Sequence, residues 1–228
     1  MHDVAVLTID LDDTLWPVAP VIAAAEYRLS RWFAEHFPRI AARTPTPKLR
    51  QSLIDRYPER RHDFAFLRKR MIEGLLTDAG YPADRVDEAY AVFLRARNEV
   101  ELFDDVEPAL SWLASRYRLL ALTNGNADLD CIGIGKYFIT TVRAADVGVA
   151  KPQPEIFDAA IAAAGVPASR ILHIGDAPLE DVGGASAAGM HTVWLNRFKR
   201  RWPQEQPTAT MTVRTLAELC RRLEGSAI

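Results

Sequence analysis

The chain has 228 residues, of which 49% are hydrophobic and 25% charged, and its formal net charge is -2 at pH 7. These values are typical of a globular protein with one large domain or two smaller ones, and the balanced charge argues against a nucleic-acid partner. Two cysteines exclude a disulfide framework, and charged residues interrupt every alanine-rich run before it could span a bilayer. We therefore expect a cytoplasmic protein, a monomer or weak homodimer, with no membrane or nucleic-acid partner.

The first predicted element is a buried strand over Val4–Ile9, an apolar run rich in β-branched residues. Three carboxylates follow it at once, Asp10, Asp12 and Asp13. In extended chain the side chains of Asp10 and Asp12 point the same way, and two close carboxylates raise each other's pKa unless a cation lies between them. A hard cation such as Mg²⁺, which takes oxygen ligands, resolves that repulsion. The alternative is a solvated acidic turn.

Residues 16–103 contain helical patterns and no convincing strand, which predicts a small helical bundle inserted after the first strand. Apolar residues recur at helical spacing on one face of each segment. The predicted helices cover Val18–Phe37, Lys48–Arg56, Asp63–Ala79 and a segment that begins at Pro82.

From Pro108 the pattern alternates between helix and strand, which predicts an α/β fold with a parallel sheet covered on both faces. The predicted strands are Tyr117–Leu122, Phe138–Arg143, Arg170–Ile174, His191–Leu195 and Thr210–Val213. The predicted helices are Pro108–Ser115, Asp128–Ile134, Glu155–Ala164, Glu180–Ala188 and Leu216–Leu223, with a loop over Gly148–Pro154.

Polar side chains follow three of these strands. Asp10 follows the first, Thr123 and Asn124 the second, and Asp176 the Arg170–Ile174 strand. The carboxyl ends of parallel strands meet at one edge of a sheet, and Lys151 lies in a loop that can reach that edge. Carboxylates that can hold a metal, with a lysine and a hydroxyl beside them, predict a site for a phosphoryl group.

Four stretches together resemble the motifs of the haloacid dehalogenase superfamily. In chain order they are Asp10-Leu-Asp-Asp-Thr14, Thr123-Asn-Gly125, Lys151-Pro152 and Gly175-Asp-Ala-Pro-Leu-Glu-Asp181. The resemblance covers residues 1–15 and 104–228, which would form the Rossmann-like hydrolase core. Residues 16–103 stand where that superfamily inserts an α-helical cap domain.

The resemblance implies a role for each catalytic position. Asp10 would be the nucleophile that forms an aspartyl-phosphate, and Asp12 would be the general acid and base. Lys151 would place a positive charge near the nucleophile. Thr123 and the backbone amide of Asn124 would hold phosphoryl oxygens.

The resemblance also implies a Mg²⁺ cofactor and its ligands. These would be Asp10, the backbone carbonyl of Asp12, and Asp176, with Asp181 and Thr14 in supporting roles. Taken alone, each motif also has a plain structural explanation, such as a turn, a surface lysine or a charge at a helix start. The buried-looking His173 is interpreted as a core histidine.

The resemblance implies hydrolysis of a small-molecule phosphate ester. Asp12 and Asp176 favour a phosphatase over a 2-haloacid dehalogenase, whose halide leaving group needs neither a proton nor a metal. A sugar-phosphate mutase and a phospho-ligand-binding scaffold remain alternatives. The sequence looks nearest to the branch that acts on 5-amino-6-(5-phospho-D-ribitylamino)uracil and FMN. There Trp16 and Phe64 could stack on a ring and Arg68 could meet a polar group, although bundle packing or a solvated helix face is the favoured explanation for each.

Overall fold

The computed structural model describes residues 3–40 and 47–225. The chain forms two compact units, one made of Met1–Pro17 and Glu101–Ile228 and the other of Val18–Val100. We call them the core unit and the helical unit. The predicted boundaries, at residues 15/16 and 103/104, lie within three residues of these divisions.

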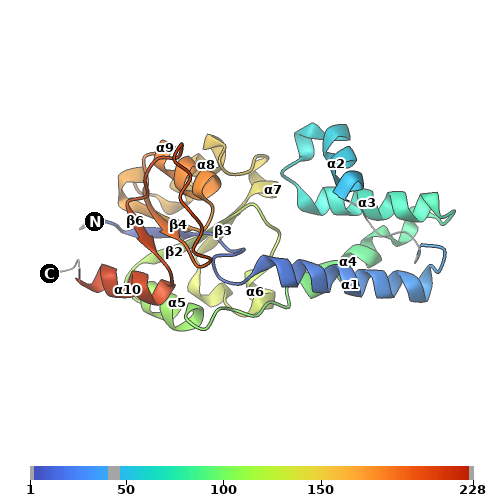
Figure 1. Cartoon of the computed structure of the whole chain (residues 1–228), viewed down its shortest axis with the longest axis horizontal. Helices are drawn as coiled ribbons and strands as arrows, with labels where there is room; N and C mark the ends of the chain where they lie inside the picture. Colours follow the sequence, from blue (N-terminus) through green and yellow to red (C-terminus); the bar gives the residue numbers. More distant parts are fainter. Residues whose placement is uncertain (1–2, 41–46, 226–228) are drawn as a thin grey trace. The chain divides into compact units, whose positions relative to one another are not determined.

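A six-stranded sheet forms the centre of the core unit, in the order β3-β2-β1-β4-β5-β6 (Figure 1). All five pairings of neighbouring strands are parallel, which confirms the predicted α/β fold with a parallel sheet. From β1 the chain adds β2 and β3 on one side of the sheet and then returns to add β4, β5 and β6 on the other side. In open parallel sheets, ligands bind beyond the carboxyl ends of the strands at such a reversal. The strands are β1 Val6–Ile9, β2 Arg118–Thr123, β3 Thr140–Arg143, β4 Ile171–Gly175, β5 His191–Leu195 and β6 Met211–Val213.

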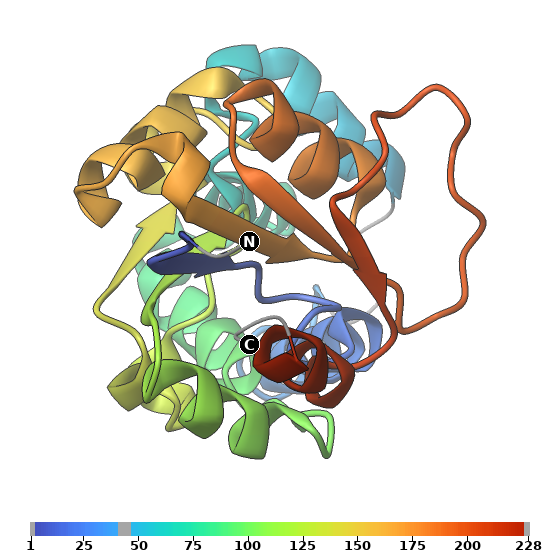
Figure 2. The same cartoon turned by 90° about the vertical axis from the view of Figure 1, so that its left-hand side faces the viewer.

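Helices cover both faces of this sheet, with α8 and α9 on one face and α5 and α10 on the other (Figures 1 and 2). Every residue of β1 and β4 is therefore buried. Coverage on both faces explains why these strands read as continuous apolar runs rather than as alternating patterns. The helices of the core unit are α5 Val106–Ala114, α6 Leu129–Ile132, α7 Ala144–Val147, α8 Pro154–Ala164, α9 Gly184–Ala187 and α10 Leu216–Gly225, with 3-10 turns at Gly135–Tyr137 and Ala168–Arg170.

Two segments of the core unit differ from the prediction. The short helix α7 was not predicted, since its four residues carry no repeat long enough to show helical spacing. The helix predicted at Glu180–Ala188 begins instead with a π-helical segment, Pro178–Gly183, and only then continues as α9. The backbone N–H groups of Asp181 and Val182 both donate to the Ala177 carbonyl, at 2.9 and 3.3 Å, which widens this first turn.

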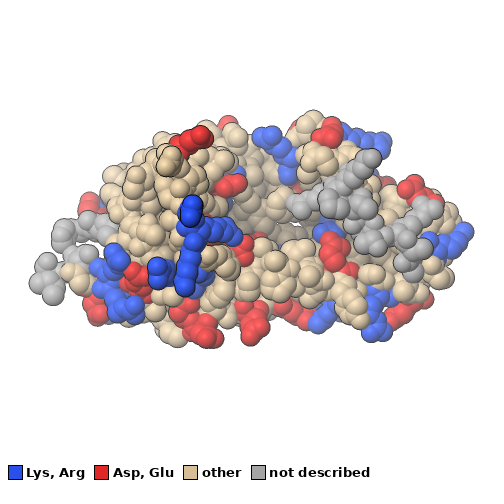
Figure 3. All heavy atoms as spheres, in the orientation of Figure 1, with Lys and Arg blue, Asp and Glu red and all other residues tan. Residues whose placement is uncertain are grey.

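The helical unit packs its apolar stripes together and carries most of its charges outside, although Arg97 of α4 is buried. Leu29 and Phe33 of α1 and Phe93 of α4 are buried in this cluster, and the Asp63 carboxylate caps α3 by accepting from the Phe66 N–H at 2.8 Å. Figure 3 shows basic and acidic side chains interspersed over the visible surface of this unit. Its elements are α1 Val18–His36, α2 Pro47–Arg56, α3 Phe64–Asp78 and α4 Val86–Arg97, with 3-10 turns at Pro58–Arg60 and Ala83–Arg85.

Within residues 3–40 and 47–225, none of the helices combines the length and the apolar character needed to cross a membrane.

Candidate active site

Three buried carboxylates meet beyond the carboxyl ends of β1 and β4. Asp10 directly follows β1 and its backbone N–H donates to the Ile174 carbonyl of β4 at 2.9 Å, while Asp176 directly follows β4. One carboxylate oxygen from each of Asp10, Asp176 and Asp181 lies within 4.8 Å of the other two. The structure therefore brings together residues from two motifs that are about 165 positions apart in the chain.

The Lys151 ammonium joins two of these carboxylates. Its Nζ donates to Asp10 Oδ1 at 2.7 Å, to Asp181 Oδ1 at 2.6 Å and to the Leu122 carbonyl at 2.9 Å. An ammonium group has three N–H donors, so these three bonds use all of them. The charge of Lys151 is thus directed at the two carboxylates, and it holds one oxygen of Asp10 in place.

The Asn124 side chain, just after β2, hydrogen-bonds to the main chain of Lys151. The Asn124 side chain donates from Nδ2 to the Lys151 carbonyl at 3.2 Å and accepts from the Lys151 N–H at 2.7 Å. The neighbouring Thr123 is buried, and its Oγ1 accepts from the Gly125 N–H at 2.9 Å. The sequence predicted only a phosphoryl contact through the Asn124 amide; the side chain has a separate function, which is to clamp the Lys151 peptide.

The cluster contains more negative charge than Lys151 can neutralise. Burial alone would raise the pKa of Asp181, but the Lys151 ammonium and the hydrogen bond from His173 hold it well below its usual range. Burial raises the pKa of Asp10 well above its usual range despite Lys151, and the Asp181 charge adds to this rise. Burial, with the Asp181 and Asp13 carboxylates, raises the pKa of Asp176 to about 7. For both Asp10 and Asp176, burial and the nearby carboxylates therefore outweigh the cation that pairs with each of them.

This donor set fits a divalent cation that prefers oxygen ligands, such as Mg²⁺. Both oxygens of Asp181 already accept hydrogen bonds, Oδ1 from Lys151 and His173, and Oδ2 from the Ala177 N–H at 2.9 Å. Asp10 Oδ2, in contrast, accepts no hydrogen bond from any residue that the structure describes. Asp10 and Asp176 are therefore the carboxylates that can hold a metal, and Asp181 serves as the anchor of Lys151.

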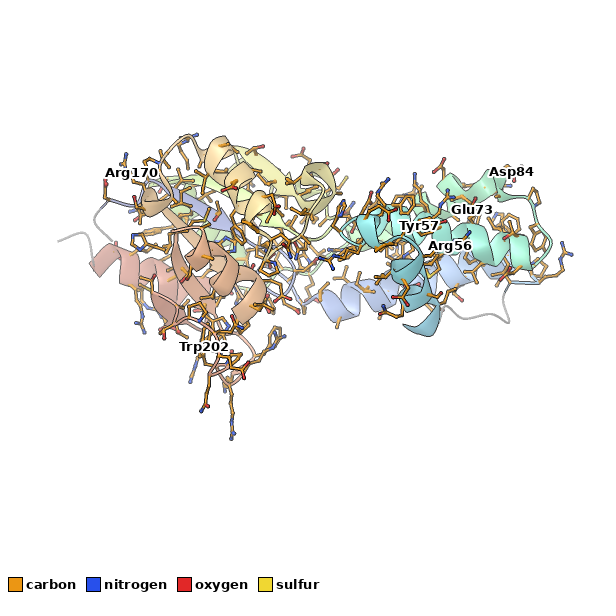
Figure 4. The ribbon with its side chains drawn as sticks, turned by 90° about the horizontal axis from the view of Figure 1, so that it is seen from above. Arg56, Tyr57, Glu73, Asp84, Arg170 and Trp202 are labelled. Atoms are coloured by element: carbon orange, nitrogen blue, oxygen red, sulfur yellow. The ribbon has the colours of Figure 1, made fainter. Side chains whose placement is uncertain are left out.

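A second cation, Arg200, reaches this cluster from the loop between β5 and β6, which extends from the sheet in Figure 2 and carries Trp202, labelled in Figure 4. Its Nη1 donates to Asp176 Oδ2 at 3.0 Å, and its Nη2 lies 3.9 Å from Asp13 Oδ2. Sequence reasoning missed this residue. The run Lys199-Arg200-Arg201 is a visible basic cluster, but nothing in its local pattern indicates that one of its members folds back onto Asp176.

The structure places the Trp16 ring in the interior rather than at a substrate-facing surface. Stacking on a substrate and packing in the interior were both considered for this ring; it is 0% exposed and its Nε1 donates to Asp12 Oδ1 at 2.9 Å. A ring with no exposed face cannot present a stacking surface, so here Trp16 orients Asp12. The Asp12 side chain lies outside the three-carboxylate cluster, and the role predicted for its backbone carbonyl as a metal ligand stays a prediction.

Thr14 is buried on the same loop and is held through its backbone. Its carbonyl accepts from Arg197 Nε at 2.9 Å, and Arg197 Nη1 donates to Asp105 Oδ1 at 2.8 Å. The Thr14 hydroxyl has no hydrogen-bond partner within the part of the chain that the structure describes. The supporting role predicted for this hydroxyl therefore stays a prediction, while the backbone contact ties the Asp10–Thr14 loop to Asp105.

Two other predicted substrate contacts belong to the helical unit. Phe64 is 38% exposed at the start of α3. Arg68 Nη1 donates to Glu26 Oε1 at 2.5 Å, and its guanidinium lies 4.1 Å from the centre of the Phe93 ring. Packing and pairing inside the helical unit therefore account for Arg68.

Comparison with known proteins agrees with this geometry. The haloacid dehalogenase-like hydrolase family profile matches residues 4–189. A 5-amino-6-(5-phospho-D-ribitylamino)uracil phosphatase, YigB of Escherichia coli K12, is 34% identical over 198 residues, which is 84% of this chain and 83% of that protein.

Two solved structures show the same fold. One, described as a 2-haloacid dehalogenase from Pseudomonas syringae pv. Tomato DC3000, has a TM-score of 0.90 and 37% identity, covering 98% of this chain and 100% of the other. The other is the HAD-hydrolase YfnB of Bacillus subtilis bound to magnesium, with a TM-score of 0.65 and 25% identity, covering 96% of this chain and 98% of the other.

Proposed function

The chain belongs to the haloacid dehalogenase-like hydrolase family, and on that premise we propose that this enzyme is a Mg²⁺-dependent phosphatase of small phosphorylated metabolites that works through an aspartyl-phosphate. The observation that supports it best is the buried cluster of Asp10, Asp176 and Asp181 around the Lys151 ammonium. A relative named as a phosphatase covers most of the chain and adds to that support.

In the first step a carboxylate oxygen of Asp10 attacks phosphorus, and the bond between phosphorus and the ester oxygen breaks. The leaving alkoxide takes a proton from Asp12, which acts as general acid. Phosphate monoesters hydrolyse extremely slowly in water, and a covalent intermediate divides that barrier between two steps. The indole N–H of Trp16 orients Asp12 for this transfer through its bond to Oδ1.

In the second step water attacks phosphorus and gives a proton to Asp12, which now acts as base. The bond between Asp10 and phosphorus breaks, which releases inorganic phosphate and restores the Asp10 carboxylate. Lys151 keeps its hydrogen bond to Asp10 Oδ1 and holds the nucleophile in one orientation. Little entropy is then lost in orienting Asp10 during the reaction. Thr123 and the Asn124 backbone amide hold phosphoryl oxygens at the end of β2.

Asp10, Asp176 and the backbone carbonyl of Asp12 would hold Mg²⁺. When bound, the ion supplies positive charge to the crowded carboxylates and to the phosphoryl group. The raised pKa values of Asp10 and Asp176 support this assignment, because both carboxyls lack enough neighbouring positive charge.

For the substrate we propose 5-amino-6-(5-phospho-D-ribitylamino)uracil or FMN. The support is the likeness to YigB, which is named for the first of these compounds. The helical unit would act as the cap that selects among phosphate esters and excludes water during the reaction. Trp16 is not part of this selection, because its ring is buried.

A second candidate is 2-haloacid dehalogenase, which the 37%-identical structure from Pseudomonas syringae favours. Displacing a halide requires neither a general acid nor a metal. On that reading Asp12 with its hydrogen bond from Trp16, and the pairing of Asp176 with Asp10, would have no chemical purpose. Those two features make the phosphatase the better candidate.

The test is a panel of phosphate esters, including both proposed substrates, assayed for phosphate release with Mg²⁺ and with EDTA. Chloride release from 2-chloropropionate is measured in parallel. We expect Mg²⁺-dependent phosphate release, and we expect Asp10→Asn to lower it by at least about a thousandfold, since the amide cannot act as the nucleophile. Asp158→Asn, a change of the same type at an exposed position of α8, serves as the matched control.

Each alternative predicts a different result. Phosphate release that survives Asp10→Asn, or that is unaffected by EDTA, contradicts the proposed mechanism. Chloride release without ester hydrolysis identifies a dehalogenase. A phosphoryl shift to another hydroxyl of a sugar phosphate identifies a mutase, and tight binding of a phosphate ester without turnover identifies a scaffold.

A further inference from the structure

A polar pair crosses the middle of the otherwise apolar central strands. Thr8 of β1 and His173 of β4 are register partners in the parallel sheet, and they are 0% and 1% exposed. Thr8 Oγ1 lies 2.8 Å from His173 Nδ1, and His173 Nε2 lies 3.2 Å from Asp181 Oδ1. Through Asp181 this pair connects to Lys151 and then to Asp10. The reaction proposed above uses neither Thr8 nor His173.

The surroundings determine which ring nitrogen carries the proton. Asp181 Oδ1 accepts from the Lys151 ammonium at 2.6 Å and Oδ2 accepts from the Ala177 N–H at 2.9 Å, so the carboxylate acts as a hydrogen-bond acceptor at both oxygens. His173 Nε2 must therefore carry the proton that it donates to Asp181. Burial lowers the pKa of His173 and so favours the neutral ring, in which Nδ1 is the acceptor and the Thr8 hydroxyl donates to it. A single neutral tautomer satisfies every polar atom of the pair, as a buried ring requires.

This bond completes a three-point hold on Asp181. Its Oδ1 accepts from His173 and Lys151, and its Oδ2 accepts from the Ala177 N–H. The Asp181 carboxylate also packs directly against Gly175, where an added Cβ would lie only 2.2 Å from it. With all three donors of Lys151 in use, a rotation of Asp181 would move the ammonium away from Asp10.

We propose that Thr8 and His173 are positioning residues of the reaction: Thr8 holds His173 in the Nε2–H tautomer, and His173 holds Asp181 in the rotamer that keeps Lys151 on Asp10. This inference rests on the proposed phosphatase function. Neither residue touches the reacting atoms. They act through Asp181 and Lys151, in the way that residues behind a metal or catalytic ligand commonly do.

The test uses a near-isosteric pair of variants in the full chain, with p-nitrophenyl phosphate and Mg²⁺ as the assay. Thr8→Val removes the hydroxyl and keeps the shape, and we expect kcat to fall about tenfold with KM changed less than about twofold. Thr8→Ser keeps the donor and should retain at least about half of the wild-type kcat. A residue that only packs in the core would lower the melting temperature of Thr8→Val and leave kcat unchanged.

His173 is tested by the same logic. His173→Gln keeps an N–H donor near Asp181, whereas His173→Leu removes it, so we expect the loss of kcat to be several-fold larger for the leucine variant. Activities are compared per folded molecule, measured by near-ultraviolet circular dichroism. Equal losses in the two variants, or no loss in folded Thr8→Val, would overturn the proposal.

A spectroscopic measurement tests the network without any assay. In the protein labelled with ¹⁵N-histidine, the signal missing from His173→Gln identifies His173 among the five histidines. We expect it to show the Nε2–H tautomer in the wild type and in Thr8→Ser, and a changed signal in Thr8→Val. An Nδ1–H tautomer in the wild type would refute the network. A wild type that shows the expected tautomer but hydrolyses no phosphate ester would instead refute the proposed function.

Discussion

The two units differ in where their ion pairs lie. In the core unit Asp10, Lys151 and Asp181 are buried and hydrogen-bonded to one another, where desolvation offsets most of their attraction. In the helical unit ion pairs such as Arg28–Glu99 are about half exposed, and Arg97 of α4 is a buried exception. Both units also contain a buried apolar cluster. Buried charges that contribute little to stability are typical of functional sites, so the comparison locates the chemistry in the core unit.

Replacing Lys151 is expected to have the largest effect, because it breaks the buried network at its centre. Lys151→Met leaves Asp10 and Asp181 buried without their cation. We expect the free energy of unfolding at pH 8 to fall by about 3–5 kcal/mol and the catalytic rate to fall at least about a hundredfold. Urea unfolding and steady-state hydrolysis measure the two effects.

The matched control for this change is Lys136→Met, at a lysine of the same unit whose side chain is 63% exposed. The stability loss of Lys151→Met should shrink toward pH 4, where protonation removes the unpaired carboxylate charges. A loss below about 1 kcal/mol at pH 8 would mean that the buried pairs are energetically no different from surface ones.

Asp176 gives an intermediate effect with a defined pH dependence. Its pKa in the folded protein is about 7, above the ordinary value of 3.8, so between these values the folded state keeps a proton that the unfolded state releases. In EDTA the wild type should therefore lose stability as pH rises from about 4 to 7. Asp176→Asn cannot ionise and should be more stable than the wild type at pH 8, by roughly 2–4 kcal/mol.

Thermal unfolding across this pH range checks the prediction, with Asp146→Asn as the control because the side chain of Asp146 is 66% exposed. Adding Mg²⁺ at pH 8 should raise the melting temperature of the wild type and not that of Asp176→Asn, since ligands of the folded state stabilise it. Equal stabilisation of both proteins by Mg²⁺ would remove Asp176 from the predicted ligand set.

The smallest effect is expected in the helical unit. Arg28 Nη1 donates to Glu99 Oε1 at 2.6 Å, but the two side chains are 51% and 49% exposed. Breaking this pair with Glu99→Gln should cost less than about 1 kcal/mol and leave the rate unchanged, because water and salt screen such pairs. A loss above about 2 kcal/mol in urea unfolding would show that the contrast between the units is smaller than the burial indicates.

Local patterns were sufficient to predict most of the architecture. The strand at Val4–Ile9, the alternation after Pro108 and the helices of residues 16–103 all follow from the period of the apolar residues, and the structure confirms the parallel sheet. Positions where the period is short or distorted were missed, such as α7, or misjudged, such as the π-helical start at Pro178. A four-residue helix is too short to show a period.

The candidate site, too, could be predicted only in part from the sequence. Asp10, Lys151, Asp176 and Asp181 could be expected at one edge because each follows a strand or lies in the loop or helix just beyond one. The sequence did not indicate that Trp16 is buried against Asp12.

The sequence by itself determined the order of strands and helices along the chain and the reactive residue types at the strand ends, because both depend on neighbours within a few positions. Only the tertiary structure decided which atoms meet: His173 with Thr8 across 165 residues, and Arg200 with Asp176 from a long loop. Hydrogen bonds are satisfied or lost over a few tenths of an ångström, and that precision comes from strand register and packing rather than from any local pattern.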